Sequence, residues 1–160
     1  MTLRLSKHLR TLVGALALAA ALPSLAATKV NIAVVSLDGD PRHAPPRLEK
    51  AYPGHPTGRA IDGVQLAAED SAFELDAAGI ALEVKDVVLP NAAGLTKALA
   101  DLKAAKVQHV VADLPAAELR ALVQAAPAAL GGVIVFNAAA DDDALRGAQC
   151  AAHLLHTVPS

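Results

Sequence analysis

The sequence predicts an α/β fold with an open, mainly parallel sheet and helices on both of its faces. Two observations carry this prediction. Segments typical of strands and of helices alternate about four times along the chain. The strand segments are also nearly continuous apolar runs, as expected of parallel strands that helices cover on both sides.

The first expected elements lie in the N-terminal half. Residues 29–36 form a β-branched strand that ends in a turn, and a proline-rich loop between Pro41 and Pro56 follows. A helix is expected to begin at Thr57 or Gly58. Gly79 is well placed to end it in a left-handed conformation. One narrow stripe of this helix is expected to be buried, namely Ile61, Val64, Ala68, Ser71 and Leu75.

The later elements repeat the same alternation. Residues 80–89 form a second strand, and a second helix then places Leu95, Leu99, Leu102 and Ala105 on one face. Residues 107–112 form the third strand, and Pro115 starts a third helix at a position that proline tolerates. The rest is expected to be a fourth strand at 133–137, a short helix at 141–147 and an extended piece at 153–157.

This fold class predicts where a ligand would bind. Open parallel sheets bind ligands at the carboxyl ends of their strands, here the loops at residues 37–46, 90–91, 113–115 and 137–143. The residues expected to bind a small polar molecule there are Ser36, Leu37, Asp38, Asp113 and Asn137. At the start of the first helix, Arg59 and Asp62 either reach the same ligand or form an exposed ion pair.

The N-terminus has the features of a secretory signal peptide. Arg4, Lys7 and Arg10 precede an apolar run at residues 11–22, and Pro23 and small residues follow. The run is shorter than the roughly 20 apolar residues that span a bilayer. We expect cleavage near Ala26, export to the periplasm, and no stable membrane insertion of the mature chain.

Composition narrows the classes of partner. Three of the 14 basic residues lie in the signal, so 11 basic residues remain against 16 acidic ones in residues 27–160. This acidic balance argues against nucleic acid as a partner. Cys150 is the single cysteine, so the chain has no internal disulfide. We expect its thiol to be buried and inert, since free cysteine behaves as a small hydrophobe.

No motif for catalysis or for a cofactor is present. The sequence has no Gly-x-Ser-x-Gly elbow and no phosphate loop, so we expect no enzyme, no catalytic residue and no cofactor. Asp141, Asp142 and Asp143 are acidic, but consecutive side chains diverge, and we expect one of them to cap the short helix at Ala144.

The histidines near the C-terminus do not predict a metal site either. His153 and His156 lie three residues apart, a spacing that can chelate zinc on a helix, and His43 and His55 lie in the proline-rich loop. On an extended segment the same spacing points the side chains of His153 and His156 to opposite faces. We therefore expect separate, solvated histidines and no metal.

Two groups of residues resemble a known family. The strand Lys-Val-Asn-Ile-Ala-Val-Val-Ser at 29–36, the helix Gly-Arg-Ala-Ile-Asp-Gly-Val-Gln-Leu-Ala at 58–67 and Asp-Ala-Ala-Gly-Ile at 76–80 resemble the first lobe of a type I periplasmic substrate-binding protein. Branched-chain amino acid receptors of ABC importers typify this family. Residues 137–147, with Cys150 and residues 154–160, resemble the branch associated with pyrroloquinoline-quinone-dependent alcohol oxidation.

The resemblance implies a non-enzymatic, exported solute-binding component of an ABC-type import system or of a quinoprotein alcohol-oxidation system. Its partners would then be a small polar ligand and an ABC permease or an exported quinoprotein dehydrogenase. The alternative is a periplasmic protein-interaction module that docks an exported dehydrogenase or cytochrome and binds no small molecule.

The sequence departs from the family pattern in two ways. Amino-acid receptors of this type have Gly-Pro and small hydroxyl residues where this chain has Asp113-Leu114-Pro115-Ala116-Ala117, so a free amino acid is not the expected ligand. The family also closes two lobes around its ligand. Residues 27–160 are therefore expected to be an incomplete N-terminal lobe, after a signal peptide at residues 1–26.

Overall fold

The computed structural model describes residues 27–44 and 58–159. The predicted signal peptide, with its cleavage site at Ala26, and most of the proline-rich loop lie outside the described residues. Within the described part of the chain, no helix combines the length and the apolar character needed to cross a membrane.

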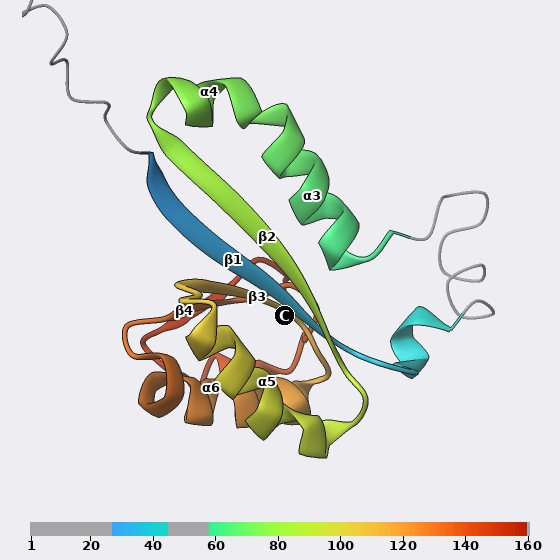
Figure 1. Ribbon diagram of the computed structural model, residues 1–160. Helices are drawn as coiled ribbons and strands as arrows, with labels where there is room; N and C mark the ends of the chain where they lie inside the picture. The colour runs from blue at the N-terminus through green and yellow to red at the C-terminus, as the bar shows by residue number, and fades with distance from the viewer. Residues whose placement is uncertain (1–26, 45–57, 160) are drawn as a thin grey trace, which may run out of the picture.

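The core of the fold is one sheet of five parallel strands in the order β2-β1-β3-β4-β5, which confirms the predicted α/β class (Figure 1). The long strands β1 and β2 pair along their whole length, whereas the other three strands are short. The bounds are β1 Thr28–Leu37, β2 Ile80–Leu89, β3 His109–Asp113, β4 Ile134–Asn137 and β5 Leu154–His156.

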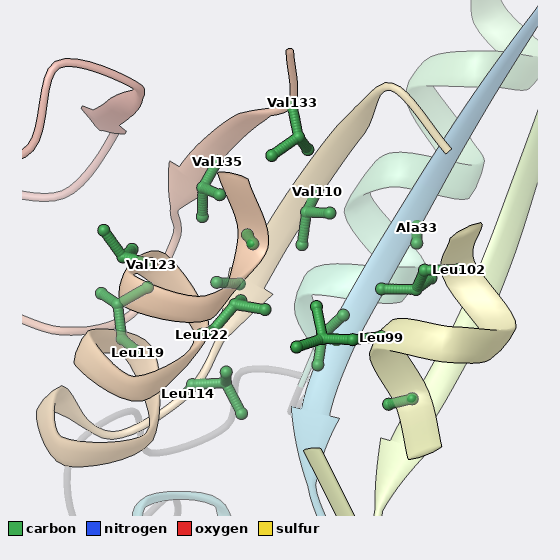
Figure 2. Packing of buried hydrophobic residues seen from close by; sticks show 14 of the residues in the cluster. Ala33, Leu99, Leu102, Val110, Leu114, Leu119, Leu122, Val123, Val133 and Val135 are labelled. Carbon is green, nitrogen blue, oxygen red and sulfur yellow. The ribbon is translucent and has the colours of Figure 1, made fainter. Parts of the chain in front are cut away.

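Helices α5 (Leu95–Ala104) and α6 (Ala116–Leu130) cover one face of the sheet (Figure 1). Their leucines pack against small and branched side chains of three central strands (Figure 2). The fully or almost fully buried members include Ala33, Leu99, Leu102, Val110, Leu119, Leu122 and Val135. Each buried leucine contributes about 1.5–3 kcal/mol relative to exposure, so this face carries most of the hydrophobic stabilisation.

The opposite face is covered much less. Helices α3 (Ala60–Asp70) and α4 (Ala72–Ala77) run along β2 and β1, and neither contains a buried residue (Figure 1). The predicted stripe is therefore only partly correct. Ile61, Val64, Ala68 and Leu75 are half-buried, but Ser71 is exposed and lies at the break between the two helices.

Several element ends differ from the prediction. Helix α3 begins at Ala60 because Arg59 is extended and the Asp62 carboxylate accepts the backbone N–H of Arg59 at 2.8 Å. Val107 is buried but precedes the ladder of β3, which starts at His109. Gly79 has the predicted positive φ, at 68°. The described residues also include three short 3-10 turns, η1 Pro41–His43, η2 Ala92–Gly94 and η3 Asp143–Leu145.

Candidate functional site

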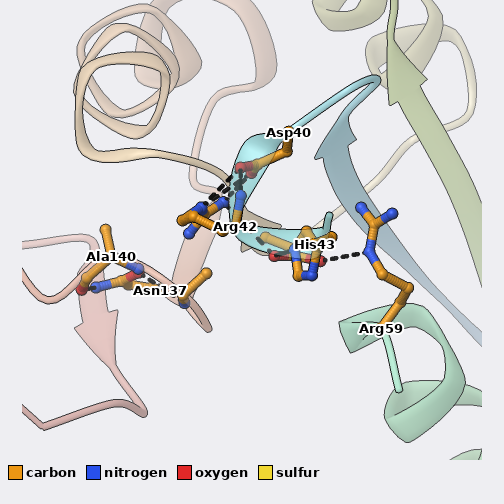
Figure 3. A network of polar contacts seen from close by, with 8 residues as sticks. Asp40, Arg42, His43, Arg59, Asn137 and Ala140 are labelled. Carbon is orange, nitrogen blue, oxygen red and sulfur yellow. Dashed lines mark hydrogen bonds and ion pairs between the residues drawn. The ribbon is translucent and has the colours of Figure 1, made fainter. Parts of the chain in front are cut away.

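Five charged or titratable side chains meet at the carboxyl ends of β1 and β3 (Figure 3). We call this group the Asp113 cluster, and its members are Asp40, Arg42, His43, Arg59 and Asp113. Asp113 is the last residue of β3. Asp40, Arg42 and His43 come from the turn that follows β1, and Arg59 precedes α3. The parallel pairing of β1 and β3 places the turn after β1 beside Asp113.

The Asp113 carboxylate is the centre of the cluster. Its side chain is 4% exposed, His43 Nε2 lies 2.9 Å from Oδ1, and Arg59 Nε donates to Oδ2 at 3.3 Å. Arg42 Nη2 lies 3.7 Å from Oδ1. Removing a carboxylate from water costs several kcal/mol unless cations and hydrogen bonds compensate it. The three neighbours supply that compensation and hold the ends of their loops beside β3.

Asp40 is the second buried carboxylate, with a side chain that is 1% exposed. It accepts the backbone N–H of Arg42 at 2.9 Å and the Nε of the Arg42 guanidinium at 2.9 Å, and it forms an ion pair with Arg42 Nη2. Burial pushes the pKa of Asp40 upward. The hydrogen bonds from Arg42 and the charges of Arg42 and His43 outweigh that effect and hold the pKa below its ordinary value of 3.8.

A groove of about 1180 Å³ extends from the cluster along the sheet face that α5 and α6 do not cover. Arg42, His43, Arg59 and Asp113 border one part of it. The remainder lies between the sheet and α3, with an apolar lining that includes Ile32, Val64, Ala68, Leu82, Val111 and Phe136. The structure therefore joins a charged cluster and an apolar surface in one concave site.

No protein-family model matches the chain, and no curated protein matches its sequence. The structure is similar to the leucine-, isoleucine-, valine-, threonine- and alanine-binding protein from Brucella ovis in its closed conformation. The TM-score is 0.58 and the identity 17%, over 84% of this chain and 33% of that one. The chain therefore shares its open parallel α/β fold with part of that protein.

A second solved structure agrees with this assignment. It is the branched-chain amino acid transporter substrate-binding protein LivJ from Streptococcus pneumoniae in complex with isoleucine. The TM-score is 0.53 and the identity 19%, over 83% of this chain and 34% of that one. The chain thus spans about a third of the length of either protein. By their names both are binding proteins.

Within this fold, the residues predicted for the site lie in different surroundings. Asp113 borders the groove, and Ser36, 6% exposed, pairs with it in register at the ends of neighbouring strands. Leu37 packs against the hydrophobic core. Asp38 is exposed in the turn after β1, where its backbone N–H donates to Leu89 O at 2.8 Å. Only Asp113 among these four borders the groove.

The Asn137 side chain is used within its own loop. It is fully buried, and its Oδ1 accepts the backbone N–H groups of Ala139 and Ala140 at 3.2 and 2.8 Å. Its Nδ2 donates to Ala140 O at 2.6 Å and to His156 Nδ1 at 2.9 Å. Asn137 therefore shapes the loop after β4, and Ala138 and Ala139 of that loop border the groove.

Arg59 and Asp62 had two open interpretations. The structure places Arg59 beside the groove, and its guanidinium bonds to Asp113. Among the described residues, the Asp62 carboxylate bonds only to the backbone N–H of Arg59, where it caps α3. Sequence reasoning did not single out Asp40 or Arg42. The available signals were their position after a parallel strand and the Asp-x-Arg spacing, which lets Asp40 accept the N–H two residues on. Sequence reasoning also expected His43 to be solvated, which was wrong, because its side chain is 20% exposed and lies in contact with the Asp113 carboxylate.

Three other predictions concern the C-terminal region. Asp142 caps η3 by accepting the Ala144 N–H at 2.8 Å, which confirms that interpretation of the aspartates. Cys150 is exposed, so the expectation of a buried thiol was wrong. The physical reason is that Cys150 ends a turn in which residues 147–150 all face solvent, while Leu145 fills the core.

His153 and His156 are separate, as expected, but each is half-buried rather than solvated. His153 Nε2 lies 2.9 Å from Val123 O, and His156 accepts the bond from Asn137. Both imidazoles therefore connect β5 and the residue before it to other elements of the fold, namely α6 and the end of β4.

Proposed function

We propose that the chain is an exported solute-binding component that binds a small polar molecule at the carboxyl ends of the strands. It would serve an ABC-type import system or a quinoprotein alcohol-oxidation system. Residues 1–26 would direct export, and residues 27–160 would form an incomplete N-terminal lobe. The observation that carries the proposal is the groove that begins at the Asp113 cluster.

The geometry of the cluster supports binding in two ways. The cationic side chains are held in place by buried carboxylates, so less conformational entropy is lost when a ligand binds. A concave apolar surface with a few convergent polar groups is also the usual form of a small-molecule site. The binding-protein role matches what the names of the two similar structures say of those proteins.

The segment after β3 bears on the identity of the ligand. Residues 113–117 offer a buried carboxylate and no hydroxyl group. A zwitterionic amino acid would therefore lack the hydroxyl donors expected in an amino-acid receptor, and we do not propose one as the ligand.

Calorimetric titration tests the proposal with the chain purified from the periplasm after export. The panel contains small alcohols, aldehydes, carboxylic acids, pyrroloquinoline quinone and isoleucine. We expect saturable binding of at least one class, weakened about tenfold or more by Arg59→Gln because a charge-assisted hydrogen bond is lost. The matched control is Arg120→Gln on α6, whose guanidinium bonds to Gln149 on the other side of the sheet. No heat from any compound at millimolar concentration would reject the proposal.

One observation favours the alternative, a protein-interaction module. Ile134 and Leu155 lie on neighbouring strands, are 37% and 47% exposed, and face the same side as Phe136. Contiguous exposed apolar side chains are typical of contact surfaces. A pull-down from periplasmic extract would support this alternative if a dehydrogenase or cytochrome is retained by the natural chain and lost from Leu155→Lys.

A further inference from the structure

The Asp113 cluster offers the groove hydrogen-bond donors and few acceptors. The carboxylates of Asp40 and Asp113 are 1% and 4% exposed, and each is already paired with an arginine, Arg42 for Asp40 and Arg59 for Asp113. Arg59 is different, because its side chain is 36% exposed and only its Nε is bonded to a side chain. Its Nη1 and Nη2 have no partner within the described residues. This end of the groove is therefore suited to a ligand that accepts hydrogen bonds.

Two further carboxylates border the groove and have to be weighed. Asp62 and Asp141 are both exposed, and one oxygen of Asp62 already accepts the N–H of Arg59. Solvent screens exposed charges, so an ion pair with either carboxylate would stabilise a ligand ammonium only weakly. In the Asp113 cluster the charges of the two arginines and the two aspartates balance. Among the described residues, the groups of Arg59 without a partner are guanidinium donors.

The rest of the groove is apolar. Strands β1 to β4 contribute Ile32, Leu82, Val111 and Phe136, and α3 contributes Val64 and Ala68. Ile32 and Val111 come from the strand positions that alternate with the core residues Ala33 and Val110. A ligand in this groove would be recognised at its polar end by Arg59 and along its body by hydrophobic contact.

We propose that the groove binds an aliphatic monocarboxylate, with its carboxylate on the free edge of Arg59 and its hydrocarbon chain along the uncovered sheet face. This inference rests on the proposed solute-binding function and names the ligand class. The Nη1 and Nη2 groups of a guanidinium match the two oxygens of a carboxylate, which favours an acid over an alcohol. The groove, at about 1180 Å³, is somewhat larger than the usual small-molecule site and has room for a chain of several methylenes.

Calorimetry with the exported chain tests the ligand class through chain length and head group. The acids are butanoate, hexanoate and octanoate, and the matched compounds are hexan-1-ol and hexylamine. Each added methylene buried in the groove should tighten binding by about three- to fourfold. Hexanoate should bind about tenfold or more tightly than hexan-1-ol, and hexylamine should bind most weakly.

Two variants separate the contributions of Arg59 and of the apolar lining to binding. Arg59→Gln should remove the preference for acid over alcohol and leave the dependence on chain length. Val111→Thr keeps the shape of the side chain and adds a hydroxyl, so it should weaken octanoate several-fold and leave butanoate unchanged. Arg120→Gln is the control and should alter neither. Thermal unfolding of each variant checks that the lobe is intact.

The outcomes distinguish this inference from the function on which it rests. If short polar molecules bind and added methylenes do not tighten binding, the solute-binding function stands and the aliphatic ligand class is wrong. If hexylamine binds best, the assignment of the polar end to Arg59 is wrong. If neither these compounds nor the wider panel bind, both proposals fail.

Discussion

The two faces of the single sheet differ sharply in how they are covered. On one face, α5 and α6 bury leucines such as Leu102 and Leu122 to 1% exposure or less. On the other face, α3 and α4 contain no buried residue and leave a groove against the strands. Neighbouring residues of one strand therefore have different roles. Val110 supports the core, whereas Val111 lines the groove.

The largest effect on stability should come from truncating a leucine on the sheet face that α5 and α6 cover. Leu122→Ala removes a fully buried side chain and should lower the free energy of unfolding by about 2–5 kcal/mol. Leu66→Ala on α3 makes the same chemical change at a residue that is 59% exposed, and should cost no more than about 0.5 kcal/mol. Urea denaturation measures both. Similar losses for the two variants would contradict the difference between the faces.

Val110 and Val111, adjacent in β3, allow the two faces to be compared within one strand. Val110→Ala deletes two buried methyl groups and should cost about 2 kcal/mol, because both the transfer energy and the packing are lost. Val111→Ala faces the groove and should cost less than about 1 kcal/mol. The same denaturation experiment compares them. A larger loss for Val111→Ala would mean that the groove face is part of the stabilising core.

A substitution of Asn137 tests whether this residue, predicted to bind ligand, instead stabilises the loop after β4. Asn137→Ala would leave the N–H groups of Ala139 and Ala140 without their acceptor and should cost about 1–3 kcal/mol. Asp142→Ala removes an exposed cap of η3 and should cost about 1 kcal/mol or less. If Asn137→Ala is as stable as the natural chain, its side chain does not hold the loop as described.

A small, pH-dependent effect on stability is expected at Asp40. Its folded pKa lies below its ordinary value of 3.8, so the ionised form stabilises the fold above that pH. This stabilisation is lost as the pH falls through the lower, folded pKa. Asp40→Asn should therefore cost about 1 kcal/mol at pH 7, where a charge-assisted bond to Arg42 is lost. The difference from the natural chain should shrink below pH 3.8 in denaturation curves collected across pH. A difference that is constant down to low pH would contradict the pairing.

The order of strands and helices could be predicted because each is encoded locally. The β-branched run at residues 29–36, the apolar helix positions such as Leu99, and Gly79 all point to the element that the structure shows. The burial of α3 could not be predicted in the same way. Periodicity shows that Val64 and Ala68 share a face, but not how closely another surface packs against it.

The candidate site was predictable only in part for a similar reason. Asp113 could be singled out because it ends a parallel strand, where ligands bind. The meeting of His43 and Arg59 on that carboxylate depends on how two loops fold in space, which no local pattern specifies. For Asn137, the neighbouring backbone takes up the side chain's hydrogen bonds, and sequence alone does not separate that role from ligand binding.

The most direct test of the account is a methyl NMR titration of the exported chain with octanoate. The account predicts that the methyl signals of Ile32, Leu82 and Val111, which line the groove, shift with a common saturation curve. The signals of Val35, Val110 and Val135, which are fully buried on the α5 and α6 face, should stay in place. Equal shifts on both faces, or shifts confined to the packed face, would contradict the claim that one face stabilises the lobe and the other binds its ligand.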